Sequence, residues 1–378
     1  MTLFRRTELS DGRQLLFFED SGSSPTEIRP DSRPTADRPR GGALRFDMLT
    51  GEWVAVATHR QSRTHLPDAA DCPLCPSTPE RPTEIPASDF DVVVFENRFP
   101  SLGPALGTIP SDPGEAFAEA VAAPADAQSH LAAPNVGRCE VVVFTADHHD
   151  SFAGLDSRRV RTVIDAWAQR TAELSALPGI EQVFVFENRG EDIGVTMHHP
   201  HGQIYAYPYV TARAARTTAR AARYQQATGR PLMGDLLAAE QAAGERMVLT
   251  SEHFSAFVPF AARWPIEVHL VPHRQVATLA DLTEAERADL AEVYPELLRR
   301  LDGLYSTPTP YIAAWHQVPV GCEDAGAQWM HLEITSPRRA EHKLKFLAGS
   351  EAAMGAFVSD VSAEETAARL RALKEESR

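Results

Sequence analysis

The order of apolar strands, helices and histidines in the first half of the chain is repeated in the second half. In each half, two β-prone apolar runs lead to a histidine, a helix, a third strand and a fourth strand that carries another histidine. The strand segments are 92–97, 140–145, 182–188 and 198–208 in the first half and 254–260, 266–272, 311–316 and 328–335 in the second. The match is in pattern rather than in identity. It predicts a duplicated α+β unit, each copy an antiparallel sheet with a helix packed on one face.

The boundary between the two units is predicted after the histidine-rich strand. This gives an N-terminal domain over 1–208 and a C-terminal domain over 209–378, and only the first keeps the full histidine motif. Turns at Asp11-Gly12 and Thr50-Gly51 lie between β-prone runs and predict antiparallel strands on either side. The Ala-, Pro- and Asp-rich segment 104–137 is either a loop with a short helix or a functional flap.

Helical periodicity places a helix in each unit. Apolar residues recur with helical spacing over 157–174, with Asp156 or Ser157 as the candidate N-cap. A second helix is predicted from Asp281 onward, with the Thr283-x-x-Glu286 capping box at its start. The Ala- and Arg-rich stretch 209–247 is also predicted to be helical.

Charge and composition exclude several classes of binding partner for this chain. With 37 Lys and Arg against 52 Asp and Glu among 378 residues, the formal net charge is −15, which disfavours binding to nucleic acid. No run approaches 18 consecutive apolar residues, and the amino terminus is charged rather than apolar, so neither a membrane span nor a signal peptide is predicted. We therefore expect a cytoplasmic protein. Four cysteines are too few to cross-link a chain of this length by disulfides.

The densest group of reactive side chains is the segment Met197-His-His-Pro-His-Gly-Gln-Ile-Tyr205. His199 and His201 are two residues apart on an extended chain and face the same side, whereas His198 faces the other side. Gly202 allows a ligand to approach the backbone, and Gln203 offers amide donors. A single histidine is most often structural, but this combination favours a functional site.

Cys72-Pro-Leu-Cys75 has three possible roles: metal binding, dithiol redox chemistry, or simple packing. A zinc ribbon is excluded because a second Cys-x-x-Cys pair is missing. The surrounding pattern also lacks a thioredoxin-like βαβ unit. The motif by itself leaves metal binding open.

The His-Pro-His-Gly-Gln motif at 199–203, which follows Phe-Glu-Asn-Arg-Gly, resembles that of the galactose-1-phosphate uridylyltransferases, a branch of the histidine triad (HIT) superfamily. The resemblance extends over most of the chain, through HRQSR at 59–63, CPLC at 72–75, FENRF at 95–99, ADH at 146–148, AWHQVP at 314–319 and KFLAGSE at 345–351. It implies a homodimeric transferase made of two HIT-like halves. This enzyme would exchange UMP between UDP-glucose and galactose 1-phosphate by double displacement.

The resemblance also implies roles for the residues of the histidine motif. His201 would be the nucleophile, because a neutral imidazole is nucleophilic at pH 7 and its phosphoramidate can pass the uridylyl group on. Gln203 would donate hydrogen bonds to the oxygens of the α-phosphate. Asn188 and Thr196 match contacts to the substrate phosphates, with Thr196 at a position where relatives commonly have Ser.

A structural zinc is implied as well, with Cys72, Cys75, His148 and His199 as its ligands. His149 lies next to His148 and is the alternative ligand. Some relatives hold a second metal in the C-terminal half with one Glu and three His. This chain has His316 and His331 there, but Glu333 in place of the third His and Thr217 near the expected Glu, so we expect the second site to be altered or absent.

The remaining residues of the family pattern fall into two groups. The uracil and ribose would be held by Leu74, Phe95, Val141 and Asn97, although Arg98 stands where some relatives have an Asp beside the ribose. The hexose phosphate would be held by Arg60, Arg63, Lys345 and Glu351. Phe357 replaces a glutamine of well-known relatives, so that hexose contact is not expected here.

Two other functions compete with this interpretation. A sister nucleotidyltransferase or phosphorylase that acts on ADP-sugars or dinucleoside polyphosphates would use the same histidine chemistry. A zinc-dependent module that binds nucleic acid or protein would use the Cys pair for structure alone. The second alternative lacks the basic stripe that such modules carry.

Overall fold

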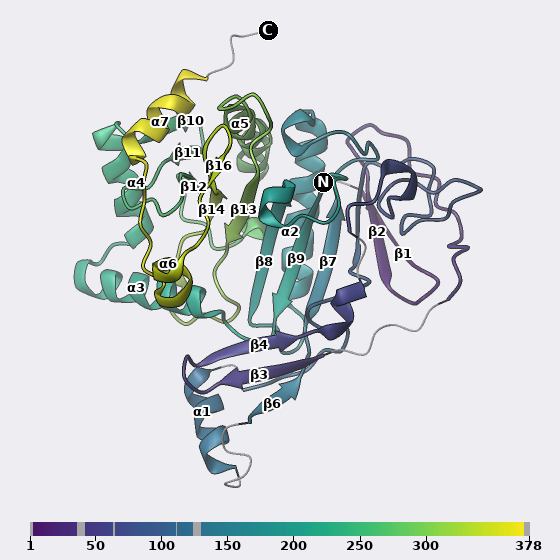
Figure 1. Cartoon of the computed structure of the whole chain (residues 1–378), viewed down its shortest axis with the longest axis horizontal. Coiled ribbons are helices and arrows are strands. Elements are labelled where there is room, and N and C mark those ends of the chain that lie inside the picture. Colours follow the sequence, from purple (N-terminus) through teal and green to yellow (C-terminus); the bar gives the residue numbers. More distant parts are fainter. Residues whose placement is uncertain (1–2, 36–41, 63–64, 111, 124–129, 374–378) are drawn as a thin grey trace.

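The centre of the structure is an antiparallel sheet that joins both halves of the chain (Figure 1). The computed structural model describes residues 3–35, 42–62, 65–110, 112–123 and 130–373. Within these residues the sheet has 11 strands in the order β1-β2-β5-β7-β9-β8-β13-β14-β12-β11-β10. In that order the strands are Phe4–Glu8, Gln14–Phe18, Val92–Glu96, Arg138–Val143, His201–Tyr207, Gln182–Arg189, Tyr311–His316, His331–Ser336, Ile266–Pro272, Phe254–Phe257 and Met247–Thr250.

The two halves meet where β8 pairs with β13. Glu187 lies opposite Ala313, and Val185 lies opposite Trp315, in antiparallel register. On each side of this pair the strands follow in the same spatial order, β9-β7-β5-β2 on one side and β14-β12-β11-β10 on the other. The predicted α+β class and its antiparallel sheets are therefore confirmed, and the two half-sheets form one continuous sheet.

One face of the sheet is covered by two long helices that pack against each other, α2 (Ser157–Ser175) and α5 (Glu284–Asp302). Each comes from a different half, as the repeated pattern predicts. Their apolar faces enclose a core in which Trp167 lies 6.4 Å from both Tyr294 and Trp315, measured between ring centroids. Burial of such aromatic side chains is the main favourable term for this layer.

The predicted helix starts are present. Asp156, rather than Ser157, is the N-cap of α2, and its side chain accepts a hydrogen bond from the backbone N–H of Arg159. Thr283 and Glu286 form the predicted capping box of α5. The segment 209–247 forms two helices, α3 (Ala212–Thr228) and α4 (Leu232–Ala243).

A small sheet, β4-β3-β6, projects from the main body together with α1 (Figure 1). Its strands are Ala43–Asp47 (β3), Glu52–Val56 (β4) and Ala132–Pro134 (β6), and α1 is Pro113–Ala122. The segment 104–137 thus contains a helix and a short strand. Positions 111 and 124–129 within it lie outside the described residues.

The C-terminal segment holds a hairpin, β15 (Arg338–Ala340) with β16 (Lys343–Leu344), then α6 (Gly349–Met354) and α7 (Ala363–Ala372). α7 packs against β10 and α5. Among the described helices, none is both long enough and apolar enough to cross a bilayer.

Candidate active site

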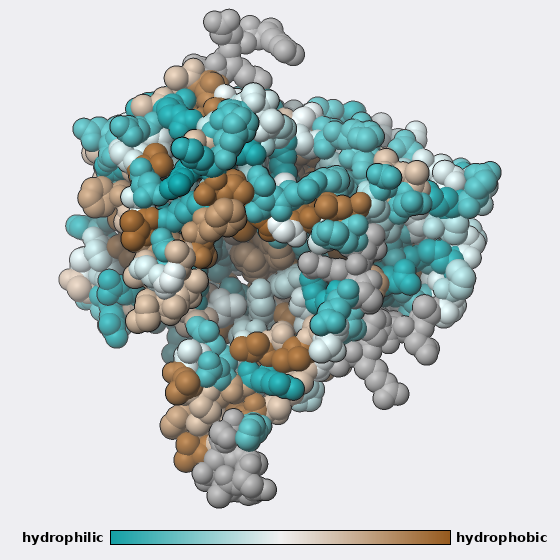
Figure 2. Space-filling model, viewed as in Figure 1, coloured by the Kyte–Doolittle hydropathy of each residue, from teal (hydrophilic) through white to brown (hydrophobic). Residues whose placement is uncertain are grey.

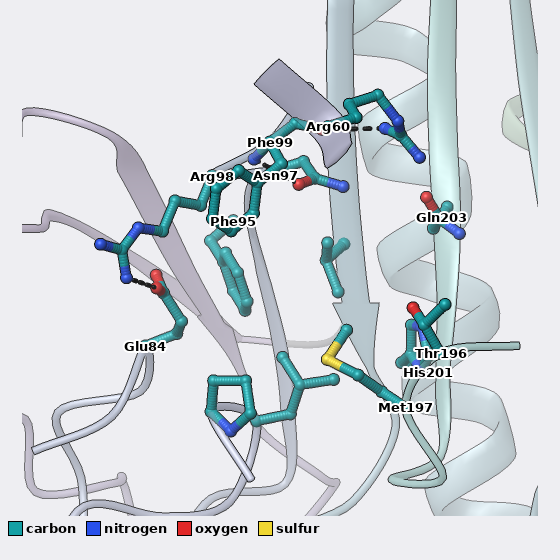
Figure 3. Close-up of a pocket in the computed structure, with 13 residues that line it drawn as sticks. Arg60, Glu84, Phe95, Asn97, Arg98, Phe99, Thr196, Met197, His201 and Gln203 are labelled. Carbon is teal, nitrogen blue, oxygen red and sulfur yellow. Dashed lines mark hydrogen bonds and ion pairs between the residues drawn. The ribbon is translucent and has the colours of Figure 1, made fainter. Parts of the chain in front are cut away.

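His201 and Gln203 of the predicted histidine motif line a cavity on the face of the sheet opposite α2 (Figure 3). Strands β5, β7 and β9 and the loops beside them supply its walls. The lining residues are Arg60, Pro73, Leu74, Glu84, Phe95, Asn97, Arg98, Phe99, Val141, Thr196, Met197, His201 and Gln203. The structure therefore brings together eight of the residues predicted from the sequence, Arg60, Leu74, Phe95, Asn97, Val141, Thr196, His201 and Gln203.

His201 is oriented by a single backbone contact. Its Nδ1 lies 2.8 Å from the carbonyl oxygen of His199, which can only accept a hydrogen bond. In the neutral ring the hydrogen is therefore on Nδ1, and Nε2 keeps its lone pair. Burial lowers the pKa of His201, which favours this neutral form. The residue thus presents an unprotonated ring nitrogen to the cavity.

Gln203 faces the same cavity because it lies two residues after His201 on β9. The intervening Gly202 points to the other face, where a Cβ would lie 2.8 Å from the Phe144 ring and 3.0 Å from the carbonyl oxygen of Phe186. Any larger residue would push β9 away from the core. Glycine at this position therefore keeps the histidine and the glutamine at their places in the sheet.

The apolar wall of the cavity comes from Leu74, Phe95 and Val141, each less than 5% exposed. Phe95 and Val141 are direct neighbours across β5 and β7, and Val141 lies opposite Gln203 of β9. The apolar wall therefore lies next to Gln203 in the pocket. Such an arrangement suits a nucleobase with a phosphate attached.

Cys72, Cys75, His148 and His199 converge beside the start of β9, with their ligand atoms all within 4.8 Å of one another. The Sγ atom of Cys75 lies 3.4 Å from the Nδ1 atoms of both His148 and His199. A tetrahedral zinc with bonds of about 2.0–2.3 Å separates its ligand atoms by roughly 3.5 Å, so the spacing fits. His148, and not His149, joins this cluster.

The electrostatics of this cluster also favour a cation. Burial, with the neighbouring Cys75, raises the pKa of Cys72 to about 11, so that two thiolates require a positive charge nearby. The Nε2 atom of His199 donates to the carbonyl oxygen of Thr145 at 2.8 Å, which leaves Nδ1 as the ligand atom. Burial lowers the pKa of His199 to about 4, which keeps its ring neutral.

Two family models match most of the chain. The model of the galactose-1-phosphate uridyl transferase N-terminal domain matches residues 35–211, and the model of the C-terminal domain matches residues 218–377. The chain belongs to the galactose-1-phosphate uridylyltransferase family. Curated and solved relatives agree with this assignment.

The galactose-1-phosphate uridylyltransferase of Streptomyces lividans is 45% identical over 318 residues, which cover 83% of this chain and 80% of the relative. That of Thermotoga maritima is 35% identical over 330 residues, or 87% of this chain and 97% of the relative. A solved structure described as a uridylyltransferase has a TM-score of 0.72 and 31% identity, and covers 88% of this chain and 98% of that chain.

Other residues that the family pattern singled out lie away from the main cavity. Asn188 lines an adjoining cavity, which also reaches His201. Lys345 and Glu351 line neither cavity and instead contact each other at 3.4 Å. Arg63 lies outside the described residues. Of the residues expected to hold the hexose phosphate, only Arg60 lines the main cavity in the described part of the chain.

Several pocket residues were not predicted from the sequence. Glu84 is buried and lies beside Arg98 at 3.6 Å, so the Arg98 side chain points toward it (Figure 3). Pro73, Phe99 and Met197 were also missed. Pro73, Phe99 and Met197 each lie inside one of the sequence motifs, which is a signal that could have found them, whereas Glu84 lies in no such motif.

A second cluster in the C-terminal half contains one histidine that the sequence did not indicate. His269 joins His331 and Glu333, with ligand atoms within 4.8 Å of one another. His316 lies beside them, 3.4 Å from Glu333. Thr217 lines the same cavity.

Proposed function

We propose that this protein is a uridylyltransferase that exchanges UMP between UDP-glucose and galactose 1-phosphate, giving UDP-galactose and glucose 1-phosphate in galactose catabolism. The observation that carries the proposal is His201, whose Nε2 lone pair faces a cavity shared with Gln203 and an apolar base-sized wall. Membership of the family supplies the substrate class.

The reaction proceeds in two displacements at the same nitrogen. Nε2 of His201 attacks the α-phosphorus of UDP-glucose, the bond from that phosphorus to the bridging oxygen breaks, and glucose 1-phosphate leaves. Galactose 1-phosphate then attacks the uridylyl-histidine, and the electron pair returns to Nε2. The carbonyl oxygen of His199 holds the ring in the reactive orientation throughout.

Several polar side chains position the substrate. Gln203 donates hydrogen bonds to the nonbridging oxygens of the α-phosphate, and Asn188 near the end of β8 and Thr196 in the loop before β9 contact the phosphates. Arg60, whose Nη1 donates to the carbonyl oxygen of Phe99 at 2.8 Å, lies on the Gln203 side of the cavity and attracts the second phosphate (Figure 3). Arg63 follows it in the same motif. Leu74, Phe95 and Val141 hold the uracil, and Asn97 lies near the ribose.

The metal at Cys72, Cys75, His148 and His199 is zinc in this proposal, and it supplies structure rather than a chemical step. Its ligands tie the loop of Leu74 to the strand of His201, because His199 lies two residues before the nucleophile. The metal would thereby fix the distance between Leu74, which contacts the uracil in this proposal, and His201.

The hexose end of the site requires a second chain. Lys345 and Glu351, which contact each other, line neither cavity of their own chain. The same segment exposes Phe346 at 78% and Met354 at 81%. We therefore propose a homodimer in which this segment reaches the partner's cavity and its carboxylate accepts hydrogen bonds from hexose hydroxyls.

The small sheet offers further apolar surface for such an assembly. Leu49, Val54 and Phe117 are at least half exposed, and Figure 2 shows apolar side chains gathered over this projection.

Residues 1–208 form the unit with nucleophile and zinc, and 209–378 form the degenerate unit. The proposal keeps the predicted cytoplasmic location.

The decisive experiment uses uracil-labelled UDP-glucose without a second sugar phosphate. The enzyme should release glucose 1-phosphate and retain the label in an acid-labile, base-stable adduct, as a phosphoramidate requires. Galactose 1-phosphate should then discharge the label as UDP-galactose. His201→Asn should still bind UDP-glucose and form no adduct. Exchange without labelled enzyme would overturn the mechanism, and preference for ADP-glucose in competition would favour the sister activity instead.

A further inference from the structure

A second cavity lies over the C-terminal half of the sheet, beside helices α3 and α4 (Figure 1). Side chains of β12, β13 and β14 form its floor, and His316 of β13 is one of them. The His316 ring lies 6.3 Å from the Phe184 ring, measured between centroids, and Phe184 pairs with Tyr205 of β9. The cavity therefore opens on the same face of the sheet as His201. It shares no lining residue with the main cavity.

One wall of this cavity carries two arginines of α3, Arg216 and Arg220. They are four residues apart and therefore lie one above the other on the same side of the helix. Both residues are exposed, and neither guanidinium group has an ion pair or a hydrogen bond within the described residues. Arg213 on the same helix differs, because its Nη2 lies 2.6 and 2.8 Å from the carboxylate oxygens of Glu333. Arg216 and Arg220 are thus available to an anion that enters the cavity.

The charge of the cavity is opposite to that of the whole chain. The formal net charge of the chain is −15, whereas the lining has two arginines and one carboxylate, that of Glu333. This carboxylate is already paired with Arg213, and Arg263 lies 3.4 Å from it. The positive charges of Arg216 and Arg220 are therefore not compensated inside the cavity. Such a local positive potential attracts small anions even on an acidic protein.

Another wall of the same cavity is apolar and is formed by Met233 and Leu236 of α4 together with Trp329. Leu236 is 47% exposed, which is unusual for a leucine that lines a cavity. The Trp329 ring is fixed, because its Nε1 donates to the carbonyl oxygen of Pro272 at 3.0 Å. Gly234 leaves room for this ring, since a Cβ there would lie 2.7 Å from it. An apolar group beside Leu236 and Trp329 would remove exposed apolar surface from water.

We propose that this cavity binds an organic phosphate, with the phosphate at Arg216 and Arg220 and the apolar body of the ligand against Leu236 and Trp329. Guanidinium groups bind phosphate by charge-assisted hydrogen bonds. The cavity has a volume of about 380 Å³, within the range of about 300–1,000 Å³ that is typical of small-molecule sites. Because the two cavities share no lining residue, the ligand binds in addition to the sugar nucleotide and does not replace it.

Equilibrium dialysis with methylumbelliferyl phosphate, an aromatic phosphate ester, tests the proposal without any sugar nucleotide. Arg216→Glu and Arg220→Glu should each weaken its binding at least about tenfold, since each removes a charge-assisted contact to the phosphate. Arg223→Glu is the matched control, because it changes the charge of α3 equally at an exposed position that does not line the cavity. It should leave binding unchanged. Equal weakening in Arg223→Glu, or unchanged binding in Arg216→Glu and Arg220→Glu, would overturn the proposal.

Two smaller probes test the two ends of the ligand separately. Inorganic phosphate and methylumbelliferone each lack one end and should bind at least about tenfold more weakly than the ester. Leu236→Gln should weaken binding of the ester about fivefold and leave that of inorganic phosphate unchanged. Either small probe binding as tightly as the ester would overturn the proposed ligand class.

Transfer of the uracil label from UDP-glucose to the protein should be the same in the unaltered protein and in all of these variants, since none of the substituted residues lines the cavity of His201. Loss of labelling in Arg216→Glu or Arg220→Glu alone would assign these arginines to the active site and overturn the proposal of a separate site.

Discussion

At the scale of single residues, the proposed reaction depends on one ring nitrogen and one amide that share a face of β9. His201 keeps a lone pair on Nε2 because its Nδ1 is bound to the carbonyl oxygen of His199. Gln203 is neutral, so it can donate to a phosphate without trapping the intermediate. In the second half, Glu333 lies opposite His269 on the neighbouring strand as Gln203 lies opposite Val141, and its carboxylate would repel an anion.

The contribution of Gln203 can be measured directly. Gln203→Ala should still form the uridylyl adduct, but about a hundredfold more slowly, since loss of an oriented donor to a developing phosphoryl charge costs about 3 kcal/mol. Single-turnover labelling with UDP-glucose measures this rate. Gln203→Glu should be slower still because its carboxylate repels the phosphate. An unchanged rate in Gln203→Ala would remove the residue from the mechanism.

Glu187 should make stability depend on pH. Its Oε1 accepts a hydrogen bond from the Tyr311 hydroxyl at 3.0 Å, while Oε2 is buried with no partner. Burial raises the pKa of Glu187 from 4.5 to about 8. Between these values the folded chain holds a proton that the unfolded chain has released, so this residue lowers stability as pH rises, by about 1.4 kcal/mol per pH unit.

Glu187→Gln should remove that dependence, because the amide stays neutral and keeps the contact with Tyr311. Unfolding midpoints of the two proteins, measured in denaturant from about pH 5 to pH 8, should therefore diverge in favour of the variant as pH rises. Parallel curves for the two proteins would show that Glu187 does not titrate in this range.

At the scale of elements, the caps of the long helices are the contacts most easily tested. The Thr283 hydroxyl accepts a hydrogen bond from the backbone N–H of Glu286 at 3.2 Å at the start of α5. Thr283→Ala should lower the free energy of unfolding by about 1 kcal/mol. Ser157→Ala, an exposed position at the start of α2 where Asp156 and not Ser157 is the N-cap, should change it by less than about 0.5 kcal/mol. Equal effects of the two substitutions would contradict the capping role.

The cysteine cluster joins a loop to two segments that are far apart in sequence. Cys72→Ser and His148→Ala should each lose bound metal at this site and lower the melting temperature, whereas His149→Ala should retain the metal. Elemental analysis with thermal unfolding measures both effects. Full metal content in Cys72→Ser would exclude this ligand set, and loss in His149→Ala alone would move the ligand by one residue.

At the scale of the whole molecule, the proposed dimer makes each active site composite. His201→Asn and Lys345→Ala should each be inactive, and mixed refolding of the two should restore part of the UMP exchange, because one of the two cavities in a mixed dimer then has both intact residues. Refolding either variant alone is the control. A monomeric mass under active conditions, or no recovery in the mixture, would contradict the composite site.

The sequence alone determined the parts that depend on local pattern. Period-two and helical spacing predicted the strands and the two long helices, and the Thr283-x-x-Glu286 box predicted where one of them starts. The same alternation placed His201 and Gln203 on one face, because residues two apart on a strand always share a face. The repeat of the pattern was sufficient to predict two antiparallel half-sheets of one plan.

The tertiary structure decided which distant side chains meet. Whether His148 or His149 joins Cys75, and that His269 lies beside Glu333, depends on pairing register and loop path. A shift of one residue in register moves a side chain to the other face of a sheet, and the sequence carries no local signal for that shift. Glu84 likewise enters the pocket only through contacts between distant segments, since the free energy of those contacts is gained only when the whole chain is folded.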